Sequence, residues 1–152
     1  MGSSGKLEVE IEVKCNADKF WDTIKDSAEI FPKAFPNDYK SIEILEGDGK
    51  SAGSIRQVTF GEGSPLVKIT KEKVEAVDDE KSTLIYSVIG GDLLNYFKHL
   101  KGHVSVTPKG DGSLVKWSSE YEKNSEEVPE PNIIKEFALK TFQKVDHYIL
   151  NA

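Results

Sequence analysis

The sequence predicts an α+β fold in which a curved antiparallel sheet holds one long helix. Strand-like segments follow one another over most of the chain, two short helical segments come early, and one amphipathic helix ends it. Because the helices are separated from a run of strands with short links, the strands should pair as an antiparallel meander. The expected order is strand, two short helices, six strands and a long helix.

The final segment, 131–150, predicts the helix around which the rest is organised. Its apolar and small residues have the i, i+3, i+4 spacing of one helix face. They are Ile134, Phe137, Ala138, Thr141, Phe142, Val145, Tyr148 and Ile149. The other face carries mostly Lys135, Glu136, Lys140, Gln143, Lys144, Asp146 and His147. The apolar face needs a sheet to cover it.

The N-terminal part predicts one strand and two short helices. Apolar residues alternate with glutamates over Leu7–Val13, as in a strand with one buried and one wet face. Asn16 is the expected N-cap of a helix that includes Phe20–Ile24. A second helical turn is expected over Ser27–Phe31 and should end at Pro32, because the residue before proline avoids helical geometry.

Six further strands are predicted at the spacing of hairpins. They cover Lys40–Glu46, Ser54–Phe60, Leu66–Ala76, Ser82–Gly90, Tyr96–Thr107 and Ser113–Glu122. The links are rich in glycine, proline and aspartate, which favour turns. The chain shows no internal repeat and no change of composition, so residues 1–152 are expected to form one domain.

Composition narrows the classes of partner. The net charge is −6, which disfavours nucleic acid or an anionic membrane as the main partner. There is no apolar run long enough to span a bilayer and no secretory signal pattern. Cys15 is the only cysteine, so no internal disulfide can form and a reducing, cytoplasmic location is expected. We expect a monomer.

Two motifs suggest sites but have simpler explanations. Gly49-Lys50-Ser51 matches the end of a phosphate loop, yet Ile44 replaces the loop's first glycine and a strand follows instead of a helix. His99 and His103 have the spacing of helical metal ligands, but on a strand they lie roughly 13 Å apart, on its wet face. We predict no metal site, no cofactor and no catalytic residue.

Arg56 is the only arginine in the chain. Strand alternation groups it with Val58 and Phe60, the more apolar face, which favours an inward side chain. In the alternative, Ile55 marks the inner face, or Arg56 lies close enough to the strand end to reach water. An inward guanidinium would favour ligands with an anionic or strongly accepting group.

A family resemblance rests on the order and spacing of several stretches. They are Gly5–Val9, Phe20-Trp21, Ile30–Pro36, Glu46–Ile55, Tyr86–Gly91, Val106–Gly110 and Trp117–Lys123. Together they resemble the major latex protein-like branch of the plant Bet v 1, or pathogenesis-related class ten, family. The resemblance implies a START-like helix-grip fold: a curved seven-stranded sheet around the C-terminal helix, with two short helices closing one end.

The resemblance also implies a cavity for amphipathic small molecules and a link to defence or stress. Two specialised activities of the superfamily are not matched. The gate and latch of its hormone receptors are replaced by Gly61–Pro65 and by Gly90–Leu94, which lacks the His-Arg pair. Ribonuclease relatives carry a glutamate before the terminal tyrosine, whereas Asp146 precedes His147 and Tyr148 here, and Tyr96 replaces another expected glutamate.

We therefore expect a non-enzymatic carrier of a hydrophobic or amphipathic small molecule. The expected lining is Phe20, Thr23, Ile24, Arg56, Val58, Phe60, Ile69, Leu84, Tyr86, Val88, Leu100, Val104, Ile134, Phe137, Ala138, Thr141 and Phe142. The same residues would also fill a solid core. Two other functions stay open: an enzyme resembling norcoclaurine synthase, with Lys73 or Tyr86 as acid/base, or a protein-interaction module.

Overall fold

The computed structural model describes residues 4–62, 68–128 and 132–151. In chain order the elements are β1 (Ser4–Val13), α1 (Ala17–Lys25), α2 (Ser27–Ala34), β2 (Tyr39–Glu46), β3 (Ile55–Phe60), β4 (Ile69–Asp78), β5 (Thr83–Gly91), the 3-10 helix η1 (Asp92–Asn95), β6 (Phe97–Lys109), β7 (Gly112–Lys123) and α3 (Asn132–Leu150). The predicted α+β fold and element order are confirmed. The predicted starts at Leu66 and Pro131 lie outside the described residues.

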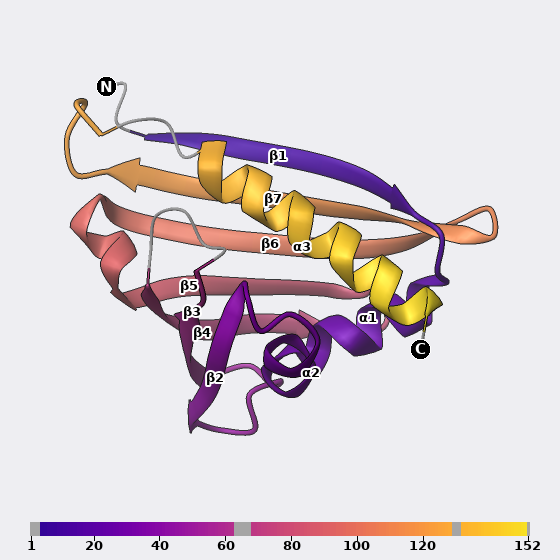
Figure 1. Ribbon diagram of the computed structural model, residues 1–152. Coiled ribbons are helices and arrows are strands. Elements are labelled where there is room, and N and C mark those ends of the chain that lie inside the picture. The colour runs from indigo at the N-terminus through magenta and orange to yellow at the C-terminus, as the bar shows by residue number, and fades with distance from the viewer. Residues whose placement is uncertain (1–3, 63–67, 129–131, 152) are drawn as a thin grey trace.

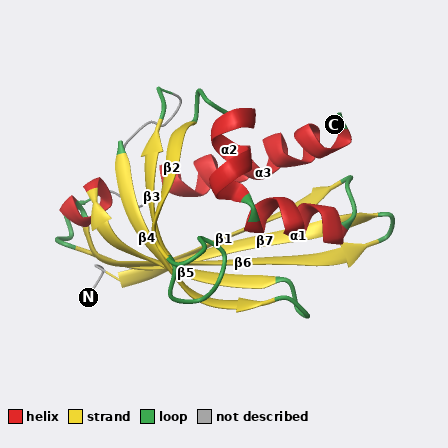
Figure 2. Ribbon diagram, turned by 90° about the horizontal axis from the view of Figure 1, so that it is seen from below, coloured by secondary structure: helices red, strands yellow, loops and turns green. Residues whose placement is uncertain are grey.

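The strands form one antiparallel seven-stranded sheet in the order β1-β7-β6-β5-β4-β3-β2. Figure 1 shows α3 running obliquely across it, from the side of β1 and β7 toward α1. Seen from below, the sheet curves, and the three α-helices lie on its concave side (Figure 2). None of the described helices has the length and hydropathy needed to cross a bilayer.

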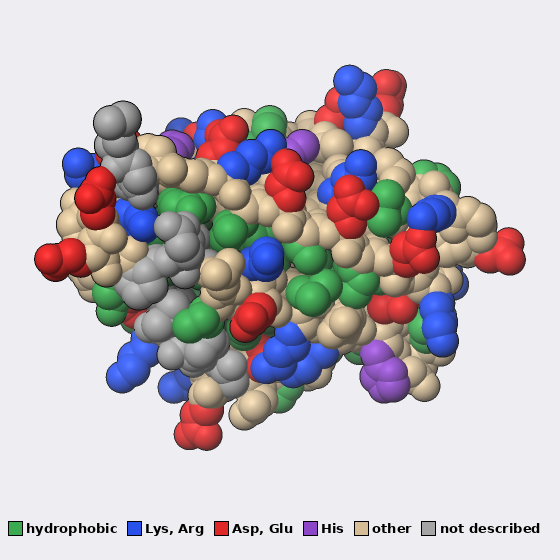
Figure 3. All heavy atoms as spheres, turned by 90° about the horizontal axis from the view of Figure 1, so that it is seen from above, with side chains coloured by type: hydrophobic (Ala, Val, Ile, Leu, Met, Phe, Trp, Pro, Cys, Tyr) green, Lys and Arg blue, Asp and Glu red, His purple; other side chains and the backbone are tan. Residues whose placement is uncertain are grey.

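β1 confirms the predicted alternation of its two faces. Its outward glutamates are exposed and pair with lysines, as Lys6–Glu8, Lys116–Glu10 and Lys109–Glu12. On the face of the molecule seen in Figure 3, acidic and basic side chains are interspersed. The three lysine–glutamate pairs of β1 lie in water, where each contributes little to stability.

Local capping explains where α1 begins. The Asn16 side-chain oxygen accepts a hydrogen bond from the Lys19 backbone N–H at 2.9 Å, as predicted for the N-cap. Phe20 and Trp21 are buried against the sheet and α3. The Trp21 indole N–H donates to Asp79, in the turn after β4, at 3.0 Å. Apolar packing on one side and a hydrogen bond on the other therefore hold α1 against the rest of the fold.

The prediction that Pro32 ends the second helix is wrong. α2 continues to Ala34 with Pro32 inside it. Proline removes a single N–H donor, and the next turn still forms because the Phe35 N–H donates to the Phe31 carbonyl at 2.7 Å. Both phenylalanines are buried, with ring centroids 5.5 Å apart, and this burial offsets the missing hydrogen bond.

Several other boundaries differ from the sequence prediction, chiefly at the turn between β6 and β7 and between β5 and β6. β6 and β7 extend toward each other until only Gly110 and Asp111 separate them, and Gly110 has a positive φ of 60°. Such a tight hairpin needs residues that tolerate left-handed backbone. The short helix η1 was not predicted between β5 and β6. It buries Leu93, and the Asp92 carboxylate accepts hydrogen bonds from the Lys68 and Ile69 N–H groups.

Polar contacts on the flanks of α3 fix the helix in place. The Asp146 carboxylate accepts hydrogen bonds from the Lys14 and Cys15 N–H groups, each at 3.0 Å. Lys140 and Lys144 both contact the buried carboxylate of Asp38, in the turn before β2. The sequence placed Lys140, Lys144 and Asp146 on the wet face, whereas they form part of the helix's attachment.

Candidate functional site

A cavity lies between the concave face of the sheet and the helices. The space open to the centre of a water molecule is about 180 Å³, whereas a single water needs about 10–15 Å³ on that measure. An organic molecule therefore fits. The described lining is mostly apolar and consists of Ile24, Ser27, Phe31, Tyr39, Phe60, Thr70, Glu72, Leu84, Tyr86, Val88, Leu93, Leu100, Val104, Trp117, Ile133, Ile134, Phe137, Ala138, Thr141 and Phe142.

Most of the residues predicted from the sequence lie in this lining. They come from α1, β3, β5, β6 and α3, the elements whose inner faces were read from alternation or helical period. They are Ile24, Phe60, Leu84, Tyr86, Val88, Leu100, Val104, Ile134, Phe137, Ala138, Thr141 and Phe142. Periodicity therefore identified which face of each element points inward.

The structure places the other predicted residues outside the lining, which corrects the expectation for each. Phe20 and Val58 are packed solidly, with 0% and 2% of their surface exposed. The Thr23 hydroxyl donates to the carbonyl of Lys19 within α1. Ile69 is 39% exposed on the outer face, because its neighbour in β4, Thr70, is the residue that points inward. Because successive residues of a strand point to opposite faces, an error of one position reverses the predicted direction of the side chain.

Arg56 points into the fold but stands behind the lining. Its guanidinium donates to the Ser27 hydroxyl of α2 at 2.7 Å and pairs with Glu72 of β4 at 3.0 Å. The two charged side chains are 16% and 15% exposed, so the alternative in which Arg56 reaches water does not hold. The pair follows from strand register, since Arg56 lies directly opposite Glu72. The arginine's charge is therefore already compensated.

Sequence reasoning missed most of the polar part of the lining, apart from Tyr86 and Thr141. Ser27, Tyr39, Thr70 and Glu72 line the cavity and were not predicted. The usable signal was the isolated Arg56: an inward arginine needs a carboxylate on a neighbouring strand, and Glu72 is an acidic residue of that strand. The apolar residues missed were Phe31, Leu93, Trp117 and Ile133.

Two tyrosines bring hydroxyl groups into the cavity. Tyr86 accepts a hydrogen bond from the Trp117 indole N–H at 3.2 Å, and Tyr39 shares one with Thr141 at 3.0 Å. Burial raises the pKa of Tyr86 to about 12, and the negative charge of Glu72 adds to this. Burial likewise raises the pKa of Tyr39. Both phenols are therefore neutral near pH 7 and can donate a proton in a hydrogen bond.

A glycine in the neighbouring strand makes room for Tyr86. Tyr86 of β5 pairs with Gly102 of β6, and a Cβ atom added to Gly102 would lie 2.2 Å from the Tyr86 ring. The ring therefore passes directly over the glycine, which positions its hydroxyl next to Trp117. Here a glycine serves close packing across two strands.

The two residues considered for acid/base chemistry, Tyr86 and Lys73, lie on opposite faces of the sheet. Tyr86 lines the cavity, whereas Lys73 is 44% exposed and lies 3.9 Å from Glu75 on the outer face. Among the described lining residues, Glu72 is the only one with a carboxyl group, and none is lysine, arginine, histidine or cysteine. The cavity thus holds one carboxylate, already paired, and two neutral phenols.

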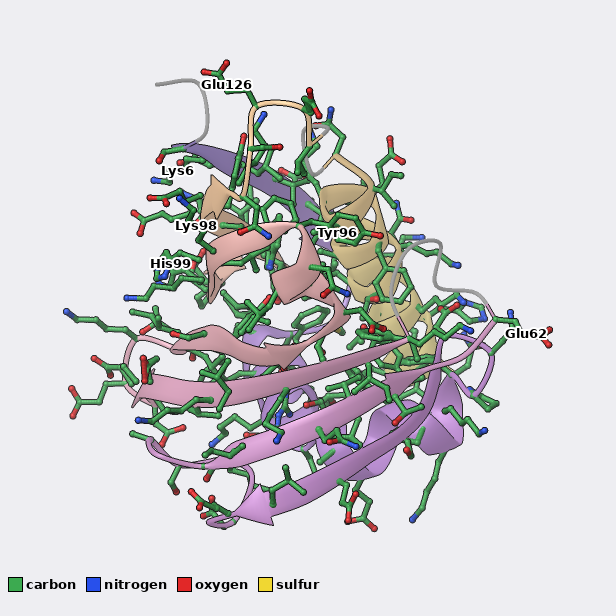
Figure 4. All side chains as sticks on the ribbon, turned by 90° about the vertical axis from the view of Figure 1, so that its left-hand side faces the viewer. Lys6, Glu62, Tyr96, Lys98, His99 and Glu126 are labelled. Atoms are coloured by element: carbon green, nitrogen blue, oxygen red, sulfur yellow. The ribbon has the colours of Figure 1, made fainter. Side chains whose placement is uncertain are left out.

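The glycine loop around Lys50 and the two histidines of β6, which the sequence analysis explained without a binding site, lie away from the cavity. In the glycine loop, the Asp48 carboxylate accepts the Lys50 and Ser51 N–H groups, each at 2.8 Å, so these donors are turned inward. His99 and His103 are exposed on the outer face, as predicted. Figure 4 shows His99 pointing away from α3. The described residues contain no cluster of three metal-binding side chains.

Comparison with known proteins agrees with this architecture. The model of the pathogenesis-related protein Bet v 1 family matches residues 2–152. The chain belongs to the Bet v 1 family. Within that family it is 55% identical to MLP-like protein 423 of Arabidopsis thaliana, over 99% of this chain and 97% of the relative. It is 38% identical to a Panax ginseng protein named ribonuclease 1, over 95% and 97% of the two chains.

Solved structures of the Bet v 1 family superpose closely. Ginseng major latex-like protein 151 has a TM-score of 0.88 at 27% identity, covering 96% of this chain and 97% of its own. Norcoclaurine synthase from Thalictrum flavum, in complex with dopamine and hydroxybenzaldehyde, has a TM-score of 0.82 at 27% identity, covering 97% and 87%. The seven-stranded sheet around a long C-terminal helix is thus the family's architecture, as the sequence resemblance implied.

Proposed function

We propose that this Bet v 1 family protein binds and carries a hydrophobic or amphipathic small molecule in the cavity beneath α3. The observation that carries the proposal is the mainly apolar cavity lining, which also includes a few hydroxyl groups from the sheet and the helices. Apolar walls supply affinity by removing ligand surface from water, and a few polar groups fix its orientation. The family, known for ligand binding, supports this function.

The finer parts of the proposal concern cell and context. We propose a monomeric plant protein of the cytoplasm that acts in defence or stress responses. The family's description as pathogenesis-related supports the defence role. The buried, unpaired Cys15 is compatible with a reducing compartment. Light scattering during size-exclusion chromatography tests the monomer, and fractionation of plant tissue tests the location.

A cavity-filling variant tests the binding function. Ala138 lines the cavity from α3, so Ala138→Phe should occupy the ligand's space. We expect it to weaken binding of N-phenyl-1-naphthylamine, a neutral fluorescent probe, by tenfold or more. Glu136→Phe, on the exposed side of the same helix, is the matched control and should leave the affinity unchanged. Equal binding by both variants would place the probe elsewhere and count against the proposal.

A second candidate is an enzyme that condenses an amine with an aldehyde. The structural match to norcoclaurine synthase and the position of Tyr86 inside the cavity favour it. The outward position of Lys73 weighs against it, since a general base must reach the reacting proton. Incubation with dopamine and 4-hydroxybenzaldehyde, followed by chiral chromatography, decides: stereoselective product that is lost in Tyr86→Phe would establish the enzyme.

A further inference from the structure

Several polar side chains in and behind the cavity lining lie on neighbouring strands of the sheet, whereas Ser27, Tyr39 and Thr141 lie on α2, β2 and α3. Arg56 is on β3, Thr70 and Glu72 are on β4, and Tyr86 is on β5. Glu72 lies opposite Arg56 on one side and opposite Val88 on the other, one inward position along β5 from Tyr86. These side chains therefore form one polar wall of a mainly apolar cavity. We refer to Arg56, Thr70, Glu72 and Tyr86 as the polar wall.

Two members of the polar wall have a buried atom without a hydrogen-bond partner in the described part of the chain: Arg56 at Nε, behind the lining, and Thr70 at its hydroxyl. Thr70 lines the cavity and is 1% exposed, yet its hydroxyl makes no hydrogen bond within the described part of the chain. Buried hydroxyl groups are nearly always satisfied, because leaving one unpaired is costly. A group of the ligand that can donate or accept a hydrogen bond would satisfy it.

Tyr86 offers a second hydrogen bond farther along the wall, because it lies opposite Val74, four residues along β4 from Thr70. The Tyr86 oxygen already accepts the Trp117 N–H, so its own proton remains to be donated. Four strand residues span roughly 13 Å, so one ligand oxygen does not reach both hydroxyls. A ligand hydroxyl or carbonyl can bond Thr70, and the wall is therefore complementary to a neutral oxygen group, provided that the ligand's apolar body fills the rest of the space.

The charged side chains of the polar wall disfavour an ionised ligand. Glu72 carries the only carboxyl group in the described lining, and Arg56 pairs with it at 3.0 Å while also donating to Ser27. A ligand carboxylate would therefore meet the negative member of a closed pair and bury its own charge without a partner. A ligand ammonium would have to compete with a guanidinium that is already in place.

We infer that the cavity selects uncharged ligands that carry a hydroxyl or carbonyl group at one end of an apolar body, held by Thr70. This inference rests on the proposed binding function and names its ligand class. It reverses the sequence-based expectation that Arg56 favours anionic ligands. Glu72, which lies opposite it across the strand pair, is the reason for the reversal.

Four ligands of one skeleton test the selectivity: 2-naphthalenemethanol, 2-methylnaphthalene, 2-naphthoate and 2-(aminomethyl)naphthalene. Their affinities are measured at pH 7.5 by displacement of N-phenyl-1-naphthylamine. We expect the alcohol to bind at least fivefold tighter than the methyl compound and at least tenfold tighter than either ion. A preference for the carboxylate or the amine overturns the inference while leaving the carrier function intact, whereas no probe binding at all overturns both.

Two variants locate the selectivity in the polar wall. Thr70→Val keeps the shape but removes the hydroxyl, so it should lower the affinity for the alcohol severalfold and leave that for 2-methylnaphthalene unchanged. Thr59→Val, on the outward face of β3, is the matched control and should change neither. Equal loss for alcohol and methyl compound in Thr70→Val contradicts the assigned hydrogen bond.

The charge argument has its own variant. Glu72→Gln leaves Arg56 without its counter-charge, so the affinity for 2-naphthoate should rise tenfold or more. An unchanged affinity for 2-naphthoate in a folded Glu72→Gln protein would show that the ion pair does not control selectivity. Should this variant fail to fold, the wild-type ligand series and Thr70→Val still decide the inference.

Discussion

At the scale of single residues, the attachment of α3 depends on one buried carboxylate. The Asp38 side chain is fully buried, and it is contacted by Lys140 at 3.2 Å and by Lys144. The two lysine side chains remain 45% and 38% exposed. Either lysine can turn into water if its partner is lost, but the aspartate cannot. Removing one lysine therefore leaves Asp38 paired, whereas removing both leaves its buried charge unpaired and destabilises the folded state.

This asymmetry predicts non-additive lysine substitutions. Lys140→Gln or Lys144→Gln alone should cost about 1 kcal/mol of unfolding free energy, because the other lysine still neutralises Asp38. The double variant should cost about 3–5 kcal/mol, since it leaves the charge buried and unpaired. Urea unfolding measures all three, with Lys33→Gln, in an exposed pair with Glu29, as the control. Additive losses would contradict the prediction.

The same carboxylate predicts a pH dependence. Burial raises the pKa of Asp38, but the hydrogen bonds from Lys144 and Lys140 outweigh it and hold the pKa below its usual value. A carboxyl group with a lower pKa in the folded state stabilises the protein above the unfolded pKa of about 3.9, and this stability disappears as the pH falls through the folded pKa.

Asp38→Asn should therefore be less stable than the wild type at pH 6, and the difference should shrink steadily below about pH 4. Urea titrations between pH 3 and 7 give the free energies of unfolding of both proteins. A difference that stays constant down to pH 3 would show that the charge of Asp38 contributes nothing and that only its shape matters.

At the scale of elements, the inner face of α3 has two structural roles: it packs in the core and it covers the cavity. Phe142 is only 6% exposed and packs on the fully buried Phe20 of α1, with ring centroids 6.1 Å apart. Phe137, one turn earlier, contacts Tyr39 and Phe60 of the cavity wall, at 5.6 and 5.7 Å. Phe142 borders the cavity on one side but belongs to the packed core on the other, so the C-terminal half of the helix is part of that core, while the preceding turns roof the cavity.

Truncation should separate these two roles. Phe142→Ala should destabilise the protein by about 3–5 kcal/mol, as in a filled core. Phe137→Ala should cost roughly half as much, since fewer packed contacts are lost beside existing space, but it should weaken binding of an apolar probe more. Urea unfolding and probe displacement are compared in both variants, with Glu136→Ala as control. Equal destabilisation by the two truncations would indicate a solid core under the whole helix.

At the scale of the whole molecule, charge bears on the ribonuclease question raised by one relative. The net charge of −6 repels RNA at long range. Asp146, which stands near the position of the relatives' acidic residue, is already bound to the backbone of Lys14 and Cys15. A carboxylate that holds two backbone N–H groups is a structural element of the α3 attachment rather than a free acid/base.

The purified protein should therefore not cleave RNA. A fluorescence-quenched RNA oligonucleotide, incubated with protein taken through several chromatographic steps, provides the measurement. Asp146→Asn should lower the unfolding temperature, because its two charge-assisted hydrogen bonds to the Lys14 and Cys15 N–H groups are weakened, without changing any residual RNA cleavage. Cleavage that co-elutes with the protein and falls in a folded single-residue variant would establish the activity instead.

Local patterns were sufficient for the elements and for most of the lining. Alternation in Leu7–Val13, the helical period of 131–150 and the turn residues between strands depend only on neighbours in the chain, so the fold class and inner faces could be derived from them. Pro32 shows the limit even for an element: its local preference predicts a helix end, and burial of Phe31 and Phe35 overrides it.

What only the tertiary structure decided depends on contacts between residues far apart in sequence. The curvature of the sheet determines that Phe60 and Leu84 border a cavity while Phe20, equally apolar, is packed solidly. Strand register pairs Arg56 with Glu72 and so turns an expected anion site into a neutral wall. The sequence determined which faces of α1, β3, β5, β6 and α3 point inward, because periodicity is local. Which of those inward residues meet empty space, and which charges cancel, depended on how distant segments come together.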